Sequence, residues 1–151
     1  MPNYYVGIDP GPSTGIAILS FHDLEPPCWS VFQVDGGTAS WLITKICEDY
    51  CPKVIAVEKF IVSNRPGTKG KDADLTRRIA NWTETAALTV KRTPKCVWRE
   101  RRAIDVKPWA TDKRLAKTDF PWGTKFKDAR DAGRHALYAA VQDGWERDPL
   151  L

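Results

Sequence analysis

The chain has 151 residues, 42% hydrophobic and 28% charged, with a formal net charge of +4, a balance typical of ordinary globular domains. This length fits a single domain over residues 1–151, and no apolar run approaches the roughly 18 residues that a membrane span requires. No basic leader followed by an apolar run precedes Tyr4, so we expect a cytoplasmic protein that is not attached to a membrane.

The first part of the chain predicts strands separated by short turns. Apolar patterning indicates three strands, over residues 4–9, 15–21 and 28–34. Because the turns between them are short, we expect these strands to pair as an antiparallel meander. A helix is predicted over 38–50, with Thr38 as its N-cap. Its expected packed face consists of Trp41, Leu42, Ile46 and Tyr50.

The rest of the chain predicts strands that alternate with helices. The nearly continuous apolar run over 53–58 is typical of a central strand, and a glycine- and cation-rich loop over 63–72 follows it. The further expected elements are a long helix over 74–91, a strand over 95–98, a short helix beginning at Thr111 and a last helix over 128–145.

This order of elements predicts an α/β fold with one five-stranded mixed sheet, three antiparallel strands then two parallel ones, flanked by helices. Right-handed crossovers place the fourth strand beside the first and the fifth beyond it. Asp9 and Glu58 each end one of these neighbouring parallel strands. We therefore expect the two carboxylates to lie side by side at the edge of the sheet where α/β proteins bind ligands.

Asp9 stands where an apolar strand enters a turn of proline and glycine residues. An ionised carboxylate at the end of a core strand is costly to desolvate unless a cation or a hydrogen-bond network compensates it. The alternative is an aspartate that caps its own turn, which is common in hairpins. This segment alone does not decide between the two.

The last helix begins with Asp128 and Asp131, which share one face, and His135 continues that face. Acids in a first helical turn also interact favourably with the helix dipole, so capping is the simpler interpretation. However, the apolar run over 136–141 indicates that this helix packs on the sheet. Packing would bring its first acids towards Asp9 and Glu58.

Four converging carboxylates repel one another unless cations lie between them. Mg²⁺ and Mn²⁺ prefer carboxylate oxygens as ligands. Two such ions about 4 Å apart can activate water on one side of a phosphodiester and stabilise the leaving oxygen on the other. The acids therefore indicate a metal-dependent nuclease with two ions in its site.

Positive charge is concentrated in one part of the chain. The segment from Lys91 to Arg134 holds 14 basic and 6 acidic residues, a local excess of +8, so the remainder carries −4. Aromatic residues are interleaved with it, namely Trp98, Trp109, Trp122 and Phe126. This combination favours a nucleic acid partner, although a solvated basic face over core tryptophans would explain each residue singly.

Three motifs together resemble the RuvC family of Holliday-junction resolvases, within the RNase H-like superfamily. They are Gly7-Ile8-Asp9-Pro10-Gly11, Val57-Glu58 and Asp128-Ala129-Arg130-Asp131-Ala132. The resemblance implies an RNase H-like fold with Asp9, Glu58, Asp128 and Asp131 as catalytic metal ligands. It also implies a homodimer that nicks two strands of a four-way DNA junction symmetrically, in recombination and repair. The short length and high tryptophan content suit a viral or otherwise divergent member, which would act in the host cytoplasm.

The resemblance also suggests DNA contacts. Lys107 and Lys113 match the basic stretch before the family's short helix, and Phe60 lies near the place of the junction-unstacking aromatic residue, although Ile61 fills the next position. Arg65, Lys69 and Lys71 are the further expected DNA-binding residues, from the cationic loop. His135, where bacterial members are commonly apolar, is expected to lie behind the ligands, to assist proton transfer or simply to pack.

Other interpretations remain open. Another RNase H-like nuclease, such as the RNA-processing YqgF type, shares the first motif, and a junction-binding protein without catalysis would share the basic segment. The apolar stripe of the helix over 74–91 could serve a dimer interface or only the core. The four cysteines lack the spacing of a zinc site, so we expect reduced thiols.

Overall fold

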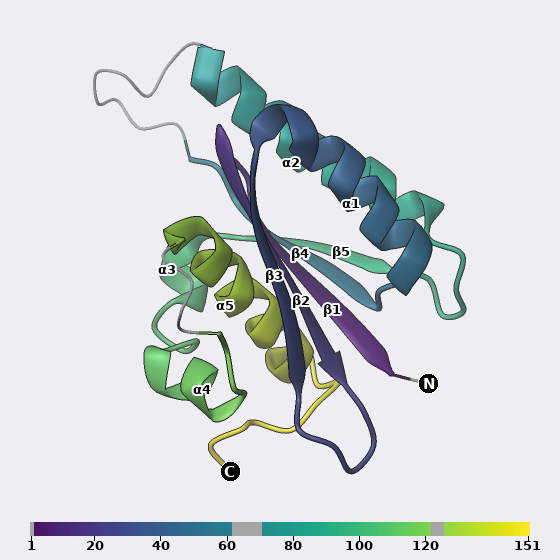
Figure 1. The fold of residues 1–151 in the computed structure, drawn as a ribbon, viewed down its shortest axis with the longest axis vertical. Helices are drawn as coiled ribbons and strands as arrows, with labels where there is room; N and C mark the ends of the chain where they lie inside the picture. Colours follow the sequence, from purple (N-terminus) through teal and green to yellow (C-terminus); the bar gives the residue numbers. More distant parts are fainter. Residues whose placement is uncertain (1, 62–70, 122–125) are drawn as a thin grey trace.

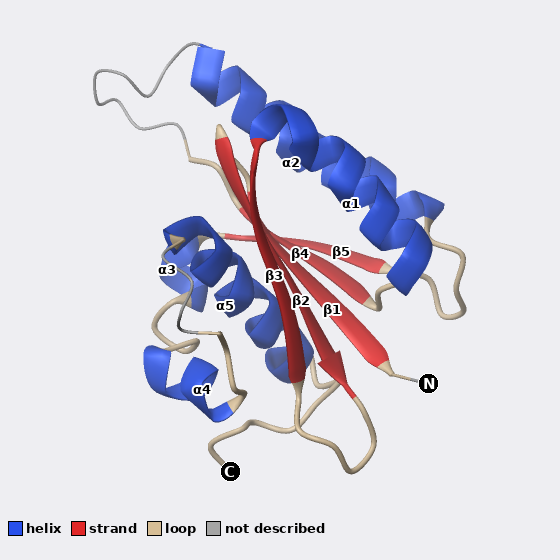
Figure 2. Ribbon diagram, in the orientation of Figure 1, coloured by secondary structure: helices blue, strands red, loops and turns tan. Residues whose placement is uncertain are grey.

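A five-stranded mixed sheet divides the protein into two helical layers (Figures 1 and 2). The structure, a computed structural model, describes residues 2–61, 71–121 and 126–151. The strands are β1 (Asn3–Asp9), β2 (Ser13–Phe21), β3 (Cys28–Asp35), β4 (Val54–Glu58) and β5 (Val97–Arg101). The helices are α1 (Gly36–Tyr50), α2 (Lys71–Thr89), α3 (Ala103–Val106), α4 (Asp112–Lys117) and α5 (Lys127–Gln142).

The strand order is β3-β2-β1-β4-β5. β1, β2 and β3 pair antiparallel, whereas β4 pairs parallel with β1 and β5 parallel with β4. The predicted mixed sheet is therefore confirmed, including the position of the fourth strand beside the first. α1 and α2 cover one face, and α5 covers the other with α3 and α4 beside it (Figure 1).

Two hydrophobic clusters fill the layers, one on each face of the sheet. Side chains of β1, β2 and β4 that point to one face join α1 and α2, and those that point to the other face join α5. This division follows from the alternation of side chains along each strand. The strands in the middle of the sheet are buried on both faces, which explains why their sequences are almost continuously apolar.

Two glycines allow α5 to lie directly on the sheet. A Cβ atom at Gly7 would stand 1.8 Å from the carbonyl oxygen of Ala132, and one at Gly15 would stand 1.9 Å from that of Asp128. Any larger residue at either position would push the helix backbone away from β1 and β2. The glycines thereby fix the start of α5, with its acidic residues, above the end of β1.

Some boundaries differ from the predictions. Asp35 rather than Thr38 caps α1, because its carboxylate accepts hydrogen bonds from the Thr38 backbone N–H at 3.1 Å and from the Thr38 hydroxyl at 2.9 Å. The expected packed face of this helix was also wrong at Trp41, which is 63% exposed. Ile43, together with Ala39 and Cys47, fills that face instead, because neighbouring residues of a helix are turned by about 100° and Trp41 lies beyond the edge of the buried row.

The later elements show similar shifts. α2 begins at Lys71 and β5 extends to Arg101, while the four-residue α3 was not predicted at all. α5 ends at Gln142, before Gly144, whose φ of +82° lies in the left-handed region that glycine adopts without strain. Most of the predicted loop over 63–72 lies outside the described residues. The four cysteines form no disulfide within the described residues.

Among the described helices, none combines the length and apolar character needed to cross a membrane.

Candidate metal centre

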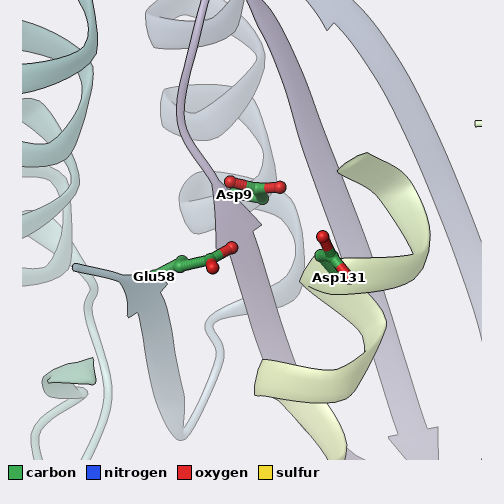
Figure 3. A group of neighbouring side chains, drawn as sticks. All are labelled: Asp9, Glu58 and Asp131. Carbon is green, nitrogen blue, oxygen red and sulfur yellow. The ribbon is translucent and has the colours of Figure 1, made fainter. Parts of the chain in front are cut away.

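Three carboxylates from distant parts of the chain meet at one edge of the sheet (Figure 3). Asp9 is the last residue of β1, Glu58 the last residue of β4, and Asp131 lies in the second turn of α5. One oxygen of each lies within 4.8 Å of an oxygen of the other two. The three side chains are close enough to bind a shared cation.

The strand topology explains two of these positions. β1 and β4 run parallel, with Ile8 paired to Val57, so the residues that follow this pair leave the sheet together. Those residues are Asp9 and Glu58. The sequence-based expectation that they would lie side by side is confirmed by their placement.

In this cluster Asp9 resists ionisation, because it is partly buried and the neighbouring carboxylates repel its charge. The pKa of Asp9 is raised to about 9, first by burial and then by the charge and hydrogen bond of Glu58 and the charges of Asp128 and Asp131. Carboxylates that face one another in a partly buried site cannot all ionise at low cost. Asp9 therefore holds a proton near neutral pH unless a cation neutralises the cluster.

Basic side chains surround Asp131, which is almost completely buried. Lys107 Nζ lies 3.1 Å from Asp131 Oδ2 and 3.8 Å from Glu58 Oε1. Lys127 Nζ lies 3.3 Å from the same Asp131 oxygen, and Arg134 Nε lies 3.6 Å from the other. The protein thus supplies positive charges at the carboxylates, two of them on exposed or half-exposed lysines that can move.

Asp128, the fourth predicted ligand, lies beside this group without belonging to it. It stands one helical turn before Asp131 and is partly exposed. Its charge reaches Asp9, whose pKa it helps to raise. The structure therefore brings three of the four predicted acids together and places the fourth nearby.

Gln33 of β3 holds the start of α5, a role that the sequence did not reveal. Its Oε1 accepts a hydrogen bond from the backbone N–H of Ala129 at 3.1 Å, while its Nε2 donates to Ser13 Oγ at 2.9 Å. Phe126, at the N-cap position of α5, provides no side-chain hydrogen bond. Gln33 therefore caps this helix from across the sheet, and only the pairing of β3 with β2 places it there.

His135 lies behind the carboxylates, one turn further along α5 than Asp131. Its side chain is fully buried, and its Nε2 stands 3.9 Å from Glu58 Oε2. Within the described part of the chain, neither ring nitrogen has a hydrogen-bond partner. Burial, followed by nearby positive charge, lowers the pKa of the imidazole to about 4, with Asp131 opposing the shift, so the ring is neutral at physiological pH.

The other predicted DNA contacts lie further out. Phe60 is half-buried, and the guanidinium carbon of Arg77 lies 5.9 Å from its ring centre. Lys113 is exposed in the first turn of α4, next to Asp112, which forms an ion pair with Arg134 of α5. Lys71 is the first residue of α2. Arg65 and Lys69 lie outside the described residues.

Two solved structures of RuvC from Thermus thermophilus share this fold. One, in complex with a Holliday junction substrate, matches with a TM-score of 0.65 and 14% sequence identity over 94% of this chain and 96% of that chain. The other gives a TM-score of 0.64 and 16% identity over 94% and 97%. The fold is RuvC-like. Neither a protein-family model nor a curated protein sequence matches the chain, so the similarity lies in the fold.

Proposed function

We propose that the protein is a metal-dependent endonuclease that resolves four-way or otherwise branched DNA by paired nicks. The observation that carries this proposal is the meeting of Asp9, Glu58 and Asp131 at one edge of a RuvC-like sheet. Asp128 joins them as a fourth acid from the first turn of α5. Such an enzyme would serve DNA recombination or repair.

The donor set fits hard divalent cations. Carboxylate oxygens are the ligands that Mg²⁺ and Mn²⁺ prefer, and a bound cation would offset the burial and the neighbouring acids that raise the pKa of Asp9. Asp9, Glu58, Asp131 and Asp128 would hold two ions. Bound there, the ions would supply activation of the attacking water and stabilisation of the leaving oxygen.

In this proposal, Lys107 and Lys127 also bind DNA phosphates once a cation has replaced them at the carboxylates. A cation that binds Asp131 and Glu58 competes with Lys107 and Lys127 for the same oxygens. Both ammonium groups then become available for DNA phosphates next to the carboxylates. Lys113 and the expected cationic contacts Arg65, Lys69 and Lys71 would extend the phosphate-binding surface, and Phe60 would unstack bases.

A homodimer completes the proposal, because a four-way junction presents two equivalent strands and a twofold dimer presents two equivalent sites. Large apolar side chains remain exposed on the layer of α1 and α2, where Trp41 is 63%, Leu88 83% and Trp82 40% exposed. Ile79 and Ala86, which lie on the apolar side of α2, are instead buried in the core. The exposed side chains are therefore the ones available to a second copy of the chain. Sedimentation of the purified protein, with and without junction DNA, tests the dimer.

Cleavage of defined DNA structures tests the activity. Purified protein is incubated with labelled four-way junction, duplex, flap and RNA of matched sequence, in Mg²⁺, Mn²⁺ or EDTA. We expect paired nicks on the junction that require the cation. Cutting of RNA alone would favour the RNA-processing alternative, and binding without any cutting would favour a non-catalytic junction-binding protein.

Two variants and a control make this test specific. Glu58→Gln and Asp131→Asn keep the side-chain shape but remove a charged ligand, so we expect cleavage to fall by about three orders of magnitude or more with junction binding retained. Glu48→Gln changes an exposed glutamate of α1 in the same way and should cut like the wild type. Full cleavage by Glu58→Gln would refute the proposed centre.

A further inference from the structure

A buried histidine that the proposed ligand set does not use faces the acidic cluster. The side chain of His135 is fully buried, and both of its ring nitrogens lack a hydrogen-bond partner among residues 2–61, 71–121 and 126–151. Buried polar groups in folded proteins are hydrogen-bonded in the great majority of cases, so an exception requires an explanation. A missing ligand is one such explanation.

The ring is directed at a particular oxygen. Glu58 Oε1 lies 3.8 Å from the ammonium of Lys107, whereas Glu58 Oε2 lies 3.9 Å from His135 Nε2. The latter distance is too long for a hydrogen bond. In an octahedral site, two donor atoms that each lie about 2.1 Å from the cation are about 3.0 Å apart at adjacent positions and about 4.2 Å apart at opposite positions. The observed separation falls within that range.

The position of the ring also follows from the helix. His135 comes four residues after Asp131, so the two side chains share the face of α5 that packs over the ends of β1 and β4. Arg101 of β5 is already paired with Asp143 at 2.5 Å, and its guanidinium lies over the ring of Tyr138. Among the described residues, Glu58 is the acid that forms a contact with the imidazole nitrogen.

We propose that His135 Nε2 is a nitrogen ligand of the cation that Glu58 binds, and that the centre therefore takes a first-row transition-metal ion such as Mn²⁺ in preference to Mg²⁺. Mg²⁺ is bound almost entirely by oxygen, whereas imidazole nitrogen is a good ligand for the transition metals. This inference rests on the metal centre of the proposed function. It adds which ion that centre selects and which residue selects it.

Pulsed electron paramagnetic resonance of the Mn²⁺-loaded full chain tests the ligand directly. The chain contains two histidines, so labelling with ¹⁵N-histidine reports only on His135 and His22. We expect a nitrogen coupling to Mn²⁺ that changes with the isotope, disappears in His135→Gln and persists in His22→Gln. Absence of this coupling in the Mn²⁺-loaded wild type overturns the proposal without any need for a variant.

Calorimetric titration tests the selectivity. His135→Gln should bind Mn²⁺ roughly 10- to 100-fold more weakly, with Mg²⁺ affinity changed less than about twofold. Equal losses for both ions would overturn the proposal, and circular dichroism confirms that the variant is folded. If it is not, the selectivity is read from the wild type, where equal affinities for the two ions overturn it.

A third variant separates this inference from the proposed function. Suppose that the wild type binds Mn²⁺ without a nitrogen coupling and that Asp9→Asn no longer binds it. This result would support the metal centre and refute only the role of His135. No binding of Mn²⁺ or Mg²⁺ to the wild type would refute both.

Discussion

Replacement of Asp9 by asparagine should stabilise the metal-free protein. Burial and the neighbouring acids raise the pKa of Asp9 from 3.8 to about 9. The folded state therefore binds this proton more tightly than the unfolded chain does. Stability from this group is complete below pH 3.8 and is lost as the pH rises towards 9.

The size of the effect follows from the same numbers. At about 1.36 kcal/mol for each pH unit, the rise from pH 3.8 to pH 7 removes up to about 4 kcal/mol of unfolding free energy. Asparagine occupies nearly the same volume and carries no charge. We expect Asp9→Asn to gain about 2–4 kcal/mol over the wild type at pH 7 in EDTA, and almost nothing at pH 4.

Divalent cations should reduce the stability difference between Asp9→Asn and the wild type. An ion that binds only the folded state adds about 2.7 kcal/mol of stability at one hundred times its dissociation constant. The wild type should show this gain in Mn²⁺, while Asp9→Asn, which lacks a ligand, should show little of it. The advantage of Asp9→Asn over the wild type should therefore shrink by about 2.7 kcal/mol when the metal is added at this concentration.

Urea denaturation followed by tryptophan fluorescence measures both effects, at pH 4 and pH 7, with EDTA or Mn²⁺. Asp23→Asn is the matched control, because Asp23 is exposed and should give wild-type stability throughout. Equal stability of Asp9→Asn and the wild type at pH 7 in EDTA would refute the repulsion inferred for this cluster. Equal stabilisation by Mn²⁺ would show that Asp9 is not a ligand.

Three further changes test how the site is built. Gly7→Ala places a methyl group against the carbonyl oxygen of Ala132, and should destabilise the protein by about 1–3 kcal/mol in urea denaturation; an unchanged midpoint would contradict the close packing of α5 on β1. Gln33→Leu removes the acceptor for the Ala129 N–H, so we expect a loss of about 1 kcal/mol together with slower junction cleavage; unchanged values of both would exclude the capping role. Lys113→Ala should lower the log–log salt dependence of junction binding by about one unit in a filter-binding titration, whereas an unaltered slope would remove this lysine from the phosphate contacts.

Local patterns in the sequence were sufficient to predict the sheet and the positions of Asp9 and Glu58. Apolar strands with short turns predicted the meander, and the right-handed crossover rule placed the fourth strand beside the first. Asp9 and Glu58 had to emerge together once those strands were adjacent and parallel. These predictions succeeded because strand pairing and crossover handedness depend on backbone geometry that every sequence shares.

Helix ends and packed faces were less predictable. Asp35 replaced Thr38 as the cap of α1 because either residue can serve, and the choice depends on where β3 ends. Trp41 was expected on the packed face of α1 beside Leu42, yet the two residues are turned by about 100° from each other, and Trp41 faces outward. The cap depends on where β3 ends, and the exposure of Trp41 depends on which side of α1 meets the sheet; apolar spacing alone resolves neither.

The sequence by itself determined the sheet, the strand order and the acids at the ends of β1 and β4. Only the tertiary structure decided how closely α5 approaches, that Asp131 joins those acids while Asp128 stays beside them, that Lys107 lies against Asp131 and Glu58, and that Gln33 caps α5. The reason is physical: these arrangements depend on contacts between segments far apart in the chain, such as the cap that Gln33 gives to Ala129 across 96 positions. No local pattern encodes such contacts, because they arise only when the packed layers fix the distances between side chains.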